Sequence, residues 1–540
     1  MDKALFQPGL IDYAIIIVYF IFVLLVGFAL KSKMKTGSDF FMSGRSVPGW
    51  ITSLAFLSAN LGAIEMLGYV GSTYQYGIMS AHFYWIGAVP AMVFLGLFMM
   101  PYYYGSKARS VPEFLKFRYN EATRAFNGIS FAVMTVLMSG VSLYAMALIL
   151  KVLLGWSMST SILLAAVIVL VYVGIGGLTS SIYNEVIQFF LIWIGLLPVV
   201  FLSLRDLGGW DGLMSRIPET FSHMWQGTGS AATNGMQVEW LGIVLGLGFV
   251  LSFGYWTTDF LVVQRAMVAK DMTAARNTPI IASFFKMLMP VLIVVPGFAA
   301  YVLLPGLGPD SSIGSYDMAL PLLMAEYYPT GLLGLGITAL LASFMSGMAG
   351  NVTAFTTVWT YDIYQAYIKK DASDKHYLNM GRISTAVGIV ISVGTAYIVM
   401  GFPSIMDYMQ TLFGFFNAPV FAVFLLGMFW KRATGWGGFW GLVAGTGTAF
   451  ALYFLLPADY YASAMAGNFW RAWWAFLAAF VVEIVVSLIT KPKPESELKG
   501  LVYGVDGKIH DDSEVEWYRK PWVLGVAAIV MLVALNAWFY

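Results

Sequence analysis

Residues 53–72 read SLAFLSANLGAIEMLGYVGS, and residues 334–353 read GLGITALLASFMSGMAGNVT. Each stretch is long enough to cross a bilayer, yet each is dense in Gly, Ala, Ser and Asn. Small residues permit close helix packing, and a helix that breaks at membrane depth exposes carbonyl groups toward a cavity. We expect both stretches to be interrupted spans, as in inverted-repeat transporters, although tight packing alone would favour the same composition.

The whole chain has the composition of a membrane protein. Of its 540 residues, 59% are hydrophobic and 11% are charged, against about 25% charged in a soluble domain. Apolar segments near the 20 residues that a helical span needs recur along the chain. They predict an all-α polytopic membrane protein of about 14 transmembrane helices, at 11–30, 50–77, 80–104, 126–155, 158–176, 183–204, 239–267, 277–304, 331–365, 379–401, 405–430, 435–456, 469–490 and 521–539.

The basic residues predict the orientation. Lys and Arg number 30, and most of them fall in the loops that follow odd-numbered spans. Positive charges in short loops favour the cytoplasm, so both termini are expected outside an inner (plasma) membrane. The side of the termini holds only Lys3, Arg205, Arg216 and Arg471. A net charge of +1 gives no reason to expect a nucleic-acid partner.

Two charged residues lie deep inside predicted spans. Lys286 is about ten residues into its span, or roughly 15 Å from its start, and must face a cavity, a carboxylate or carbonyls. Glu65 could carry a proton or pair with Lys286. Asp259 could likewise carry a proton or pair with Arg265 near the cytoplasmic end.

The aromatic pair Tyr255 and Trp256 precedes Thr257 and Thr258 in the middle of a span. Rings that stack on a sugar face and carboxamides such as Gln410 that bond its hydroxyls would suit a sugar site, although each residue alone could be core packing. With no cysteine and no HExxH motif, the chain is not expected to be an enzyme or to hold a cofactor. These residues favour a secondary transporter for a neutral polyhydroxylated or other polar solute.

Four motifs resemble the solute:sodium symporter family, and within it the sodium/glucose cotransporter branch, including bacterial sodium/galactose symporters. They are SANLGAIE at 58–65, GIGGLTSSIYNEVIQ at 174–188, YWTTDFLVVQRAMVAK at 255–270, and DYMQ at 407–410 followed by PVFAVFLLGMFWKR at 419–432. The resemblance implies a five-plus-five inverted-repeat (LeuT-like) core. Its expected parts are 1–49 (outer N-terminus, extra helix and cytoplasmic loop), repeats at 50–204 and 239–430, an external loop at 205–238, and three peripheral helices at 431–540 with a cytoplasmic loop at 491–520.

The resemblance also implies a solute site. Its expected members are Asn60, Glu65, Tyr84, Trp256, Lys286 and Gln410, with Tyr255 as an inner gate. Glu65 stands where sugar carriers commonly have Gln or His, and Tyr84 stands where they commonly have Glu. The preferred sugar is therefore expected to differ.

A cation site is implied at the first broken helix. The resemblance assigns it the carbonyls of Ser58 and Leu61, the carbonyl of Ser343 and the hydroxyl of Ser346. Gly347 occupies the position of a second hydroxyl, so Na⁺ would lose one of about five oxygens. The coupling ion is thus Na⁺ or H⁺, with Glu65, Asp259 and Glu185 as possible proton carriers.

The resulting prediction is a cation-coupled symporter that imports a glucose-like or galactose-like sugar by alternating access. A proton-coupled carrier and a non-transporting solute sensor on the same fold remain alternatives. Its expected partners are the sugar and membrane lipid, without an obligate protein partner.

Overall fold

The computed structural model describes residues 7–31, 41, 43–62, 64–457, 459–505 and 515–540. Within them, ten helices are long and apolar enough to cross a membrane, or eleven if one bent pair counts as a span. Three shorter apolar helices, Leu10–Val26, Gly49–Ser58 and Met158–Val171, lie at the predicted first, second and fifth spans. The all-α membrane class is confirmed, and the count reaches 14 only when the bent pair and the three shorter helices are each counted as a span.

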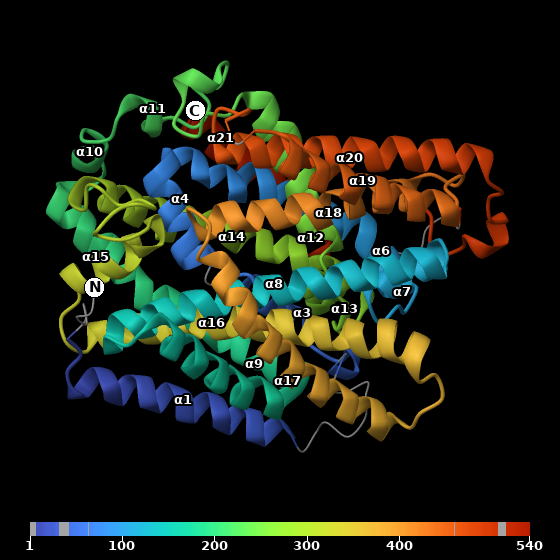
Figure 1. Cartoon of the computed structure of the whole chain (residues 1–540), viewed down its shortest axis with the longest axis horizontal. Helices are drawn as coiled ribbons and strands as arrows, with labels where there is room; N and C mark the ends of the chain where they lie inside the picture. The colour runs from blue at the N-terminus through green and yellow to red at the C-terminus, as the bar shows by residue number, and fades with distance from the viewer. Residues whose placement is uncertain (1–6, 32–40, 42, 63, 458, 506–514) are drawn as a thin grey trace.

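Most of the bundle consists of long helices that lie roughly alongside one another (Figure 1). They are α1 (Leu10–Lys31), α8 (Glu121–Leu154), α9 (Met158–Leu207), α14 (Met272–Leu303), α16 (Leu332–Thr357), α17 (Asp374–Val399), α18 (Ile405–Phe429), α19 (Gly435–Leu455), α20 (Ala464–Ile489) and α21 (Pro521–Trp538). α9 contains both the fifth predicted span and the sixth, which is the apolar stretch Ser180–Leu207.

Two spans are broken near their middle. The first consists of α3 (Gly49–Ser58), a non-helical turn, and the helical stretch Ile64–Gly68 that continues into α4 (Tyr69–Tyr76). The second consists of α12 (Phe253–Thr258) and α13 (Phe260–Met267), within a span that bends by 49°. The breaks fall in the second and seventh predicted spans, five apart, as expected of two five-helix repeats.

The prediction that the 334–353 stretch is interrupted was wrong. It lies inside α16, which is helical throughout. Its small residues serve close packing instead: a Cβ on Gly347 would lie 3.1 Å from the Cα of Gly62. α16 therefore passes directly against the turn that breaks the first span.

The peripheral helices flank this core on opposite edges (Figure 1). α1 packs on α9 and α16, whereas α19 and α20 pack on each other and on α18. α14 contacts α3, α4 and α9. The two broken spans thus meet α14, α16 and α18 in the interior.

The two ends of the described chain lie at the same end of the bundle. Asp12 near the start accepts backbone hydrogen bonds from Gly331 at 2.7 Å and Gly334 at 2.6 Å. The ring of Phe539 lies 6.4 Å from that of Trp210, in α10 (Gly209–Met214). The Tyr327 hydroxyl joins the two neighbourhoods by donating to Asp206 at 2.9 Å. An even number of predicted crossings requires both termini to lie on the same side of the membrane. That this side is the outside stays a prediction. Residues 1–6 lie outside the described residues, so their predicted external position stays a prediction too.

Candidate functional site

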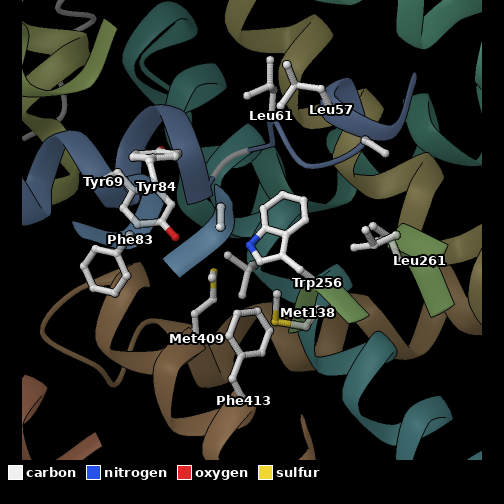
Figure 2. Packing of buried hydrophobic residues seen from close by; sticks show 14 of the residues in the cluster. Leu57, Leu61, Tyr69, Phe83, Tyr84, Met138, Trp256, Leu261, Met409 and Phe413 are labelled. Carbon is white, nitrogen blue, oxygen red and sulfur yellow. The ribbon is translucent and has the colours of Figure 1, made fainter. Parts of the chain in front are cut away.

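A small cavity lies where the broken spans meet α14 and α18. Its volume of about 40 Å³ is close to the 30 Å³ that one water occupies in the liquid. Six of the seven predicted solute residues line it. The full lining is Asn60, Ile64, Glu65, Tyr69, Phe83, Leu247, Leu251, Ser252, Tyr255, Trp256, Lys286, Met409, Gln410 and Phe413. Figure 2 shows several of the apolar members crowded around this space. A sugar could enter only if side chains moved apart.

Lys286 and Glu65 form an ion pair beside this cavity. The Lys286 Nζ lies 2.7 Å from the Glu65 Oε1, and the two residues are 1% and 5% exposed. The seventh predicted residue, Tyr84, lies behind the cavity and donates a hydrogen bond to the Glu65 Oε2. The Lys286 ammonium is also 4.8 Å from the centre of the Tyr84 ring and 5.0 Å from that of Trp256. Of the interpretations open for Lys286, the structure shows the carboxylate partner.

Tyr255 connects the second broken span to the first. Its hydroxyl donates a hydrogen bond to the Asn60 Oδ1, while the Asn60 amide donates to the Phe56 carbonyl at 2.9 Å. The Tyr255 ring lies 4.7 Å from that of Phe413. Trp256 stacks instead on Phe56, with ring centres 5.8 Å apart. Tyr255 and Phe413 are therefore in contact with each other in the lining of the cavity.

Gln410 presents an unused hydrogen-bonding group to the cavity. It is 2% exposed, and its Oε1 has no hydrogen-bond partner within the described part of the chain. Its Nε2 meets only the Met406 sulfur, at 3.9 Å. Buried polar atoms are nearly always satisfied, so an orphaned acceptor at a cavity indicates a ligand or water that donates to it.

The predicted cation residues converge where the first break meets α16. The Ser346 hydroxyl donates to the Ser58 carbonyl at 2.9 Å, and the Ser343 hydroxyl donates to the Leu61 carbonyl. The Ser58 and Ser346 hydroxyls are 3.3 Å apart, and all four residues are fully buried. This donor set contains only oxygen, which is what a hard cation such as Na⁺ requires, so the residues fit a cation.

The Ser343 hydroxyl is an oxygen that the sequence prediction did not count. It lies one helical turn before Gly347 and contacts a carbonyl of the predicted cation site. With the three carbonyls that the resemblance assigns, the Ser343 and Ser346 hydroxyls would make five oxygens despite the glycine.

The other predicted proton carriers are engaged elsewhere. Glu185 forms a fully buried ion pair with Arg265 at 2.6 Å and accepts from the Ser181 hydroxyl at 2.7 Å. Arg265 thus pairs with Glu185, rather than with Asp259 as one alternative held. Asp259 lies at the break between α12 and α13 and caps α13 by accepting from the Leu261 amide at 2.9 Å.

A short segment, Tyr316–Met318, covers the half of the first broken span nearer the termini. It packs on Ile64–Gly68 and on α4. Asp317 in this segment is 2% exposed and accepts a long hydrogen bond from the Ile405 amide at 3.3 Å. Burial, helped by the charge of Asp407, raises the pKa of Asp317 to about 7, although the Ile405 bond acts in the opposite direction. Nothing in the sequence patterns indicated this residue.

Two broken helices that enclose a polar cavity, beside a buried all-oxygen site, define a secondary transporter of the LeuT-like fold rather than an enzyme. The model of the sodium:solute symporter family matches residues 40–445, and the chain belongs to this family. The resemblance inferred from the motifs is thereby confirmed.

Curated relatives span most of the chain. It is 28% identical to the sodium/glucose cotransporter of Vibrio parahaemolyticus over 465 residues, which cover 82% of this chain and 85% of the relative. It is 27% identical to human sodium/glucose cotransporter 4, with 91% and 78% covered, and 27% identical to human sodium/myo-inositol cotransporter 2, with 81% and 69% covered.

Solved structures share the fold. A Na⁺-coupled sialic acid symporter in a substrate-bound outward-open state superposes with a TM-score of 0.76 at 20% identity, covering 90% of this chain and 99% of the other. The nucleobase-cation-symport-1 family transporter Mhp1, in a closed conformation, gives 0.52 at 12% identity, with 85% and 97% covered.

Proposed function

We propose that the chain imports a sugar, or a closely similar neutral polyol, together with Na⁺ by alternating access across the plasma membrane, with both termini outside. The observation that carries the proposal is the convergence of Asn60, Glu65, Trp256, Lys286 and Gln410 on one cavity. These residues combine rings with charged and carboxamide groups, the chemistry that binds sugar hydroxyls and ring faces. Relatives named for glucose and myo-inositol transport support the same class.

Na⁺ as the coupling ion is supported by the junction of the first broken span and α16. The carbonyls of Ser58 and Leu61 belong to one element, and the oxygens of Ser343 and Ser346 belong to the other. A bound cation would supply the positive charge that holds these oxygens together. Since the site joins two elements, occupancy would favour the conformation in which they are close.

The side chains suggest how transport would proceed. Solute hydroxyls would bond to the Gln410 oxygen and to the Asn60 carboxamide while a ring face lies on Trp256. The bond between Tyr255 and Asn60 would have to break before solute leaves inward. In this proposal the repeats at 50–204 and 239–430 move relative to each other, and the helices at 431–540 are peripheral.

Proton coupling is the second candidate, and Gly347 is the observation that favours it, because it removes a hydroxyl from the family's pattern. Proteoliposomes with imposed Na⁺ or H⁺ gradients separate the two. We expect labelled glucose, galactose or myo-inositol to accumulate with inward Na⁺ and to be indifferent to a pH gradient. Accumulation of the sugar driven by an H⁺ gradient alone would identify H⁺, in place of Na⁺, as the coupling ion. Binding without accumulation under either gradient would indicate a solute sensor.

A further inference from the structure

The central cavity is lined by one acid and one base, and they neutralise each other. Lys286 and Glu65 are the charged residues among those that line it. Their 2.7 Å separation and near-complete burial place the opposite charges in direct contact. The Lys286 ammonium also faces the rings of Tyr84 and Trp256, which stabilise a cation. The cavity therefore offers an incoming solute no uncompensated positive charge.

An anionic solute would disturb this balance. A carboxylate that bound to Lys286 would leave Glu65 buried without its cation and with a second negative charge beside it. Removing one partner of a buried pair is strongly unfavourable, and placing like charges together adds to the penalty. The Tyr84 hydroxyl cannot compensate for the loss, because it already donates to Glu65.

The unused polar group in the cavity favours a solute that carries hydroxyls. The Gln410 Oε1 is an acceptor without a partner among the described residues. A hydroxyl of a neutral or an acidic sugar can donate to it. Gln410 therefore favours a polyol, and the ion pair of Lys286 and Glu65 selects against a carboxylate on that polyol.

We propose that Glu65 is a specificity-determining residue that keeps the solute cavity neutral and thereby excludes sugar acids in favour of uncharged polyols. The inference rests on the proposed sugar transport and narrows its substrate class. It separates this chain from a carrier of an acidic sugar such as sialic acid, although a symporter of that solute shares the fold.

The test uses the full-length purified protein and two sugars that differ in one group. Glucose and glucuronate have the same ring, and glucuronate has a carboxylate in place of the hydroxymethyl group. In wild type we expect glucuronate to bind at least about tenfold more weakly than glucose. Glu65→Gln keeps the side-chain shape and an acceptor for Tyr84, but it frees the charge of Lys286. This variant should bind glucuronate at least about tenfold more tightly than wild type does.

The double variant Glu65→Gln/Lys286→Gln is neutral again and should lose that gain. Glu495→Gln serves as a matched control, because Glu495 is exposed, pairs with the exposed Lys431 at 3.1 Å, and does not line the cavity. It should leave the ratio of the two affinities unchanged. Thermal unfolding of each variant establishes that it is folded.

The outcomes separate this inference from the proposed function. Wild type that binds glucuronate as well as glucose overturns the role of Glu65, as does a folded Glu65→Gln variant that binds glucuronate no better than wild type. If wild type binds none of glucose, galactose and myo-inositol, sugar transport fails as the function. Glucuronate binding by Glu65→Gln but not by wild type would still support the charge role in that case.

Discussion

The Tyr255 hydroxyl donates a hydrogen bond to the Asn60 side chain, so the expected inner gate is fastened to a residue of the expected solute site. Tyr255→Phe would remove this bond and keep the ring against Phe413. A net hydrogen bond contributes about 1 kcal/mol, so we expect roughly fivefold faster solute exchange when the closed gate loses it. Counterflow of labelled sugar in proteoliposomes measures the change.

Tyr255→Ala is the companion variant, because it removes both the bond and the ring. Tyr255→Ala should exchange labelled sugar faster than Tyr255→Phe does. Exchange by Tyr255→Phe at the wild-type rate would show that the bond does not restrain the gate.

The Ser343 hydroxyl provides a test of the cation site. Ser343→Ala removes an oxygen that contacts the Leu61 carbonyl, so we expect the Na⁺ concentration for half-maximal thermal stabilisation to rise about threefold to tenfold. In Ser343→Ala/Gly347→Ser the hydroxyl moves one turn along α16, and part of the Na⁺ response should return. Recovery would be partial, because a Cβ at 347 would lie 3.1 Å from the Gly62 Cα.

Ser142 on α8 is a suitable control for this experiment. Its Oγ lies 3.6 Å from the position that a Cβ on Gly347 would take, so it is the hydroxyl that a different arrangement would use. Ser142→Ala should leave the Na⁺ response intact. Loss of the response in Ser142→Ala, with Ser343→Ala unaffected, would assign the oxygen to α8 instead.

The sequence predicted the parts of the site that charge and composition single out. Lys286 is costly to bury, so a partner or cavity was required, and Glu65 was among the candidates. The small-residue stretch at 53–72 was correctly expected to break. The similar stretch at 334–353 was not distinguishable from it, because close helix packing and a broken helix select the same residue types.

Contacts between distant segments were beyond the sequence. The sequence offered Asp259 as a partner for Arg265, and only the fold shows that Arg265 pairs with Glu185. Tyr69 also lines the cavity and was not among the predicted solute residues. Its position four residues after Glu65 places it on the same helix face, which could have indicated it. Glu483 was overlooked as an intramembrane acid; it is fully buried and accepts from the Tyr119 hydroxyl at 2.5 Å.

Asp317 predicts how stability depends on pH. Folding raises its pKa from 3.8 to about 7, chiefly through burial, so between these values the folded protein binds more protons than the unfolded chain. Its contribution to stability therefore falls as pH rises through that interval, by at most about 1.4 kcal/mol per pH unit. We expect a higher melting temperature at pH 5 than at pH 8, and Asp317→Asn should reduce the difference.

Two groups next to Asp317 affect its pKa and are unchanged in the Asp317→Asn variant. Asp407 lies close enough to repel its charge, and the Ile405 amide donates to it. Since both remain in Asp317→Asn, the variant isolates one carboxyl. An unchanged difference between pH 5 and pH 8 in Asp317→Asn would assign the pH response to other groups.

Breaking the ion pair between Glu185 and Arg265 tests whether Glu185 has a structural role or carries a proton. Both side chains are 0% exposed, and a buried charge left without its partner typically costs about 3–5 kcal/mol. Glu185→Gln should therefore lower the melting temperature strongly, whereas Glu495→Gln, which breaks the exposed pair with Lys431, should have little effect. Replacing both members, in Glu185→Gln/Arg265→Met, should recover part of the stability, because no buried charge is then left unpaired. A Glu185→Gln variant that keeps wild-type stability and transports sugar without any response to a pH gradient, where wild type responds, would instead make Glu185 a proton carrier.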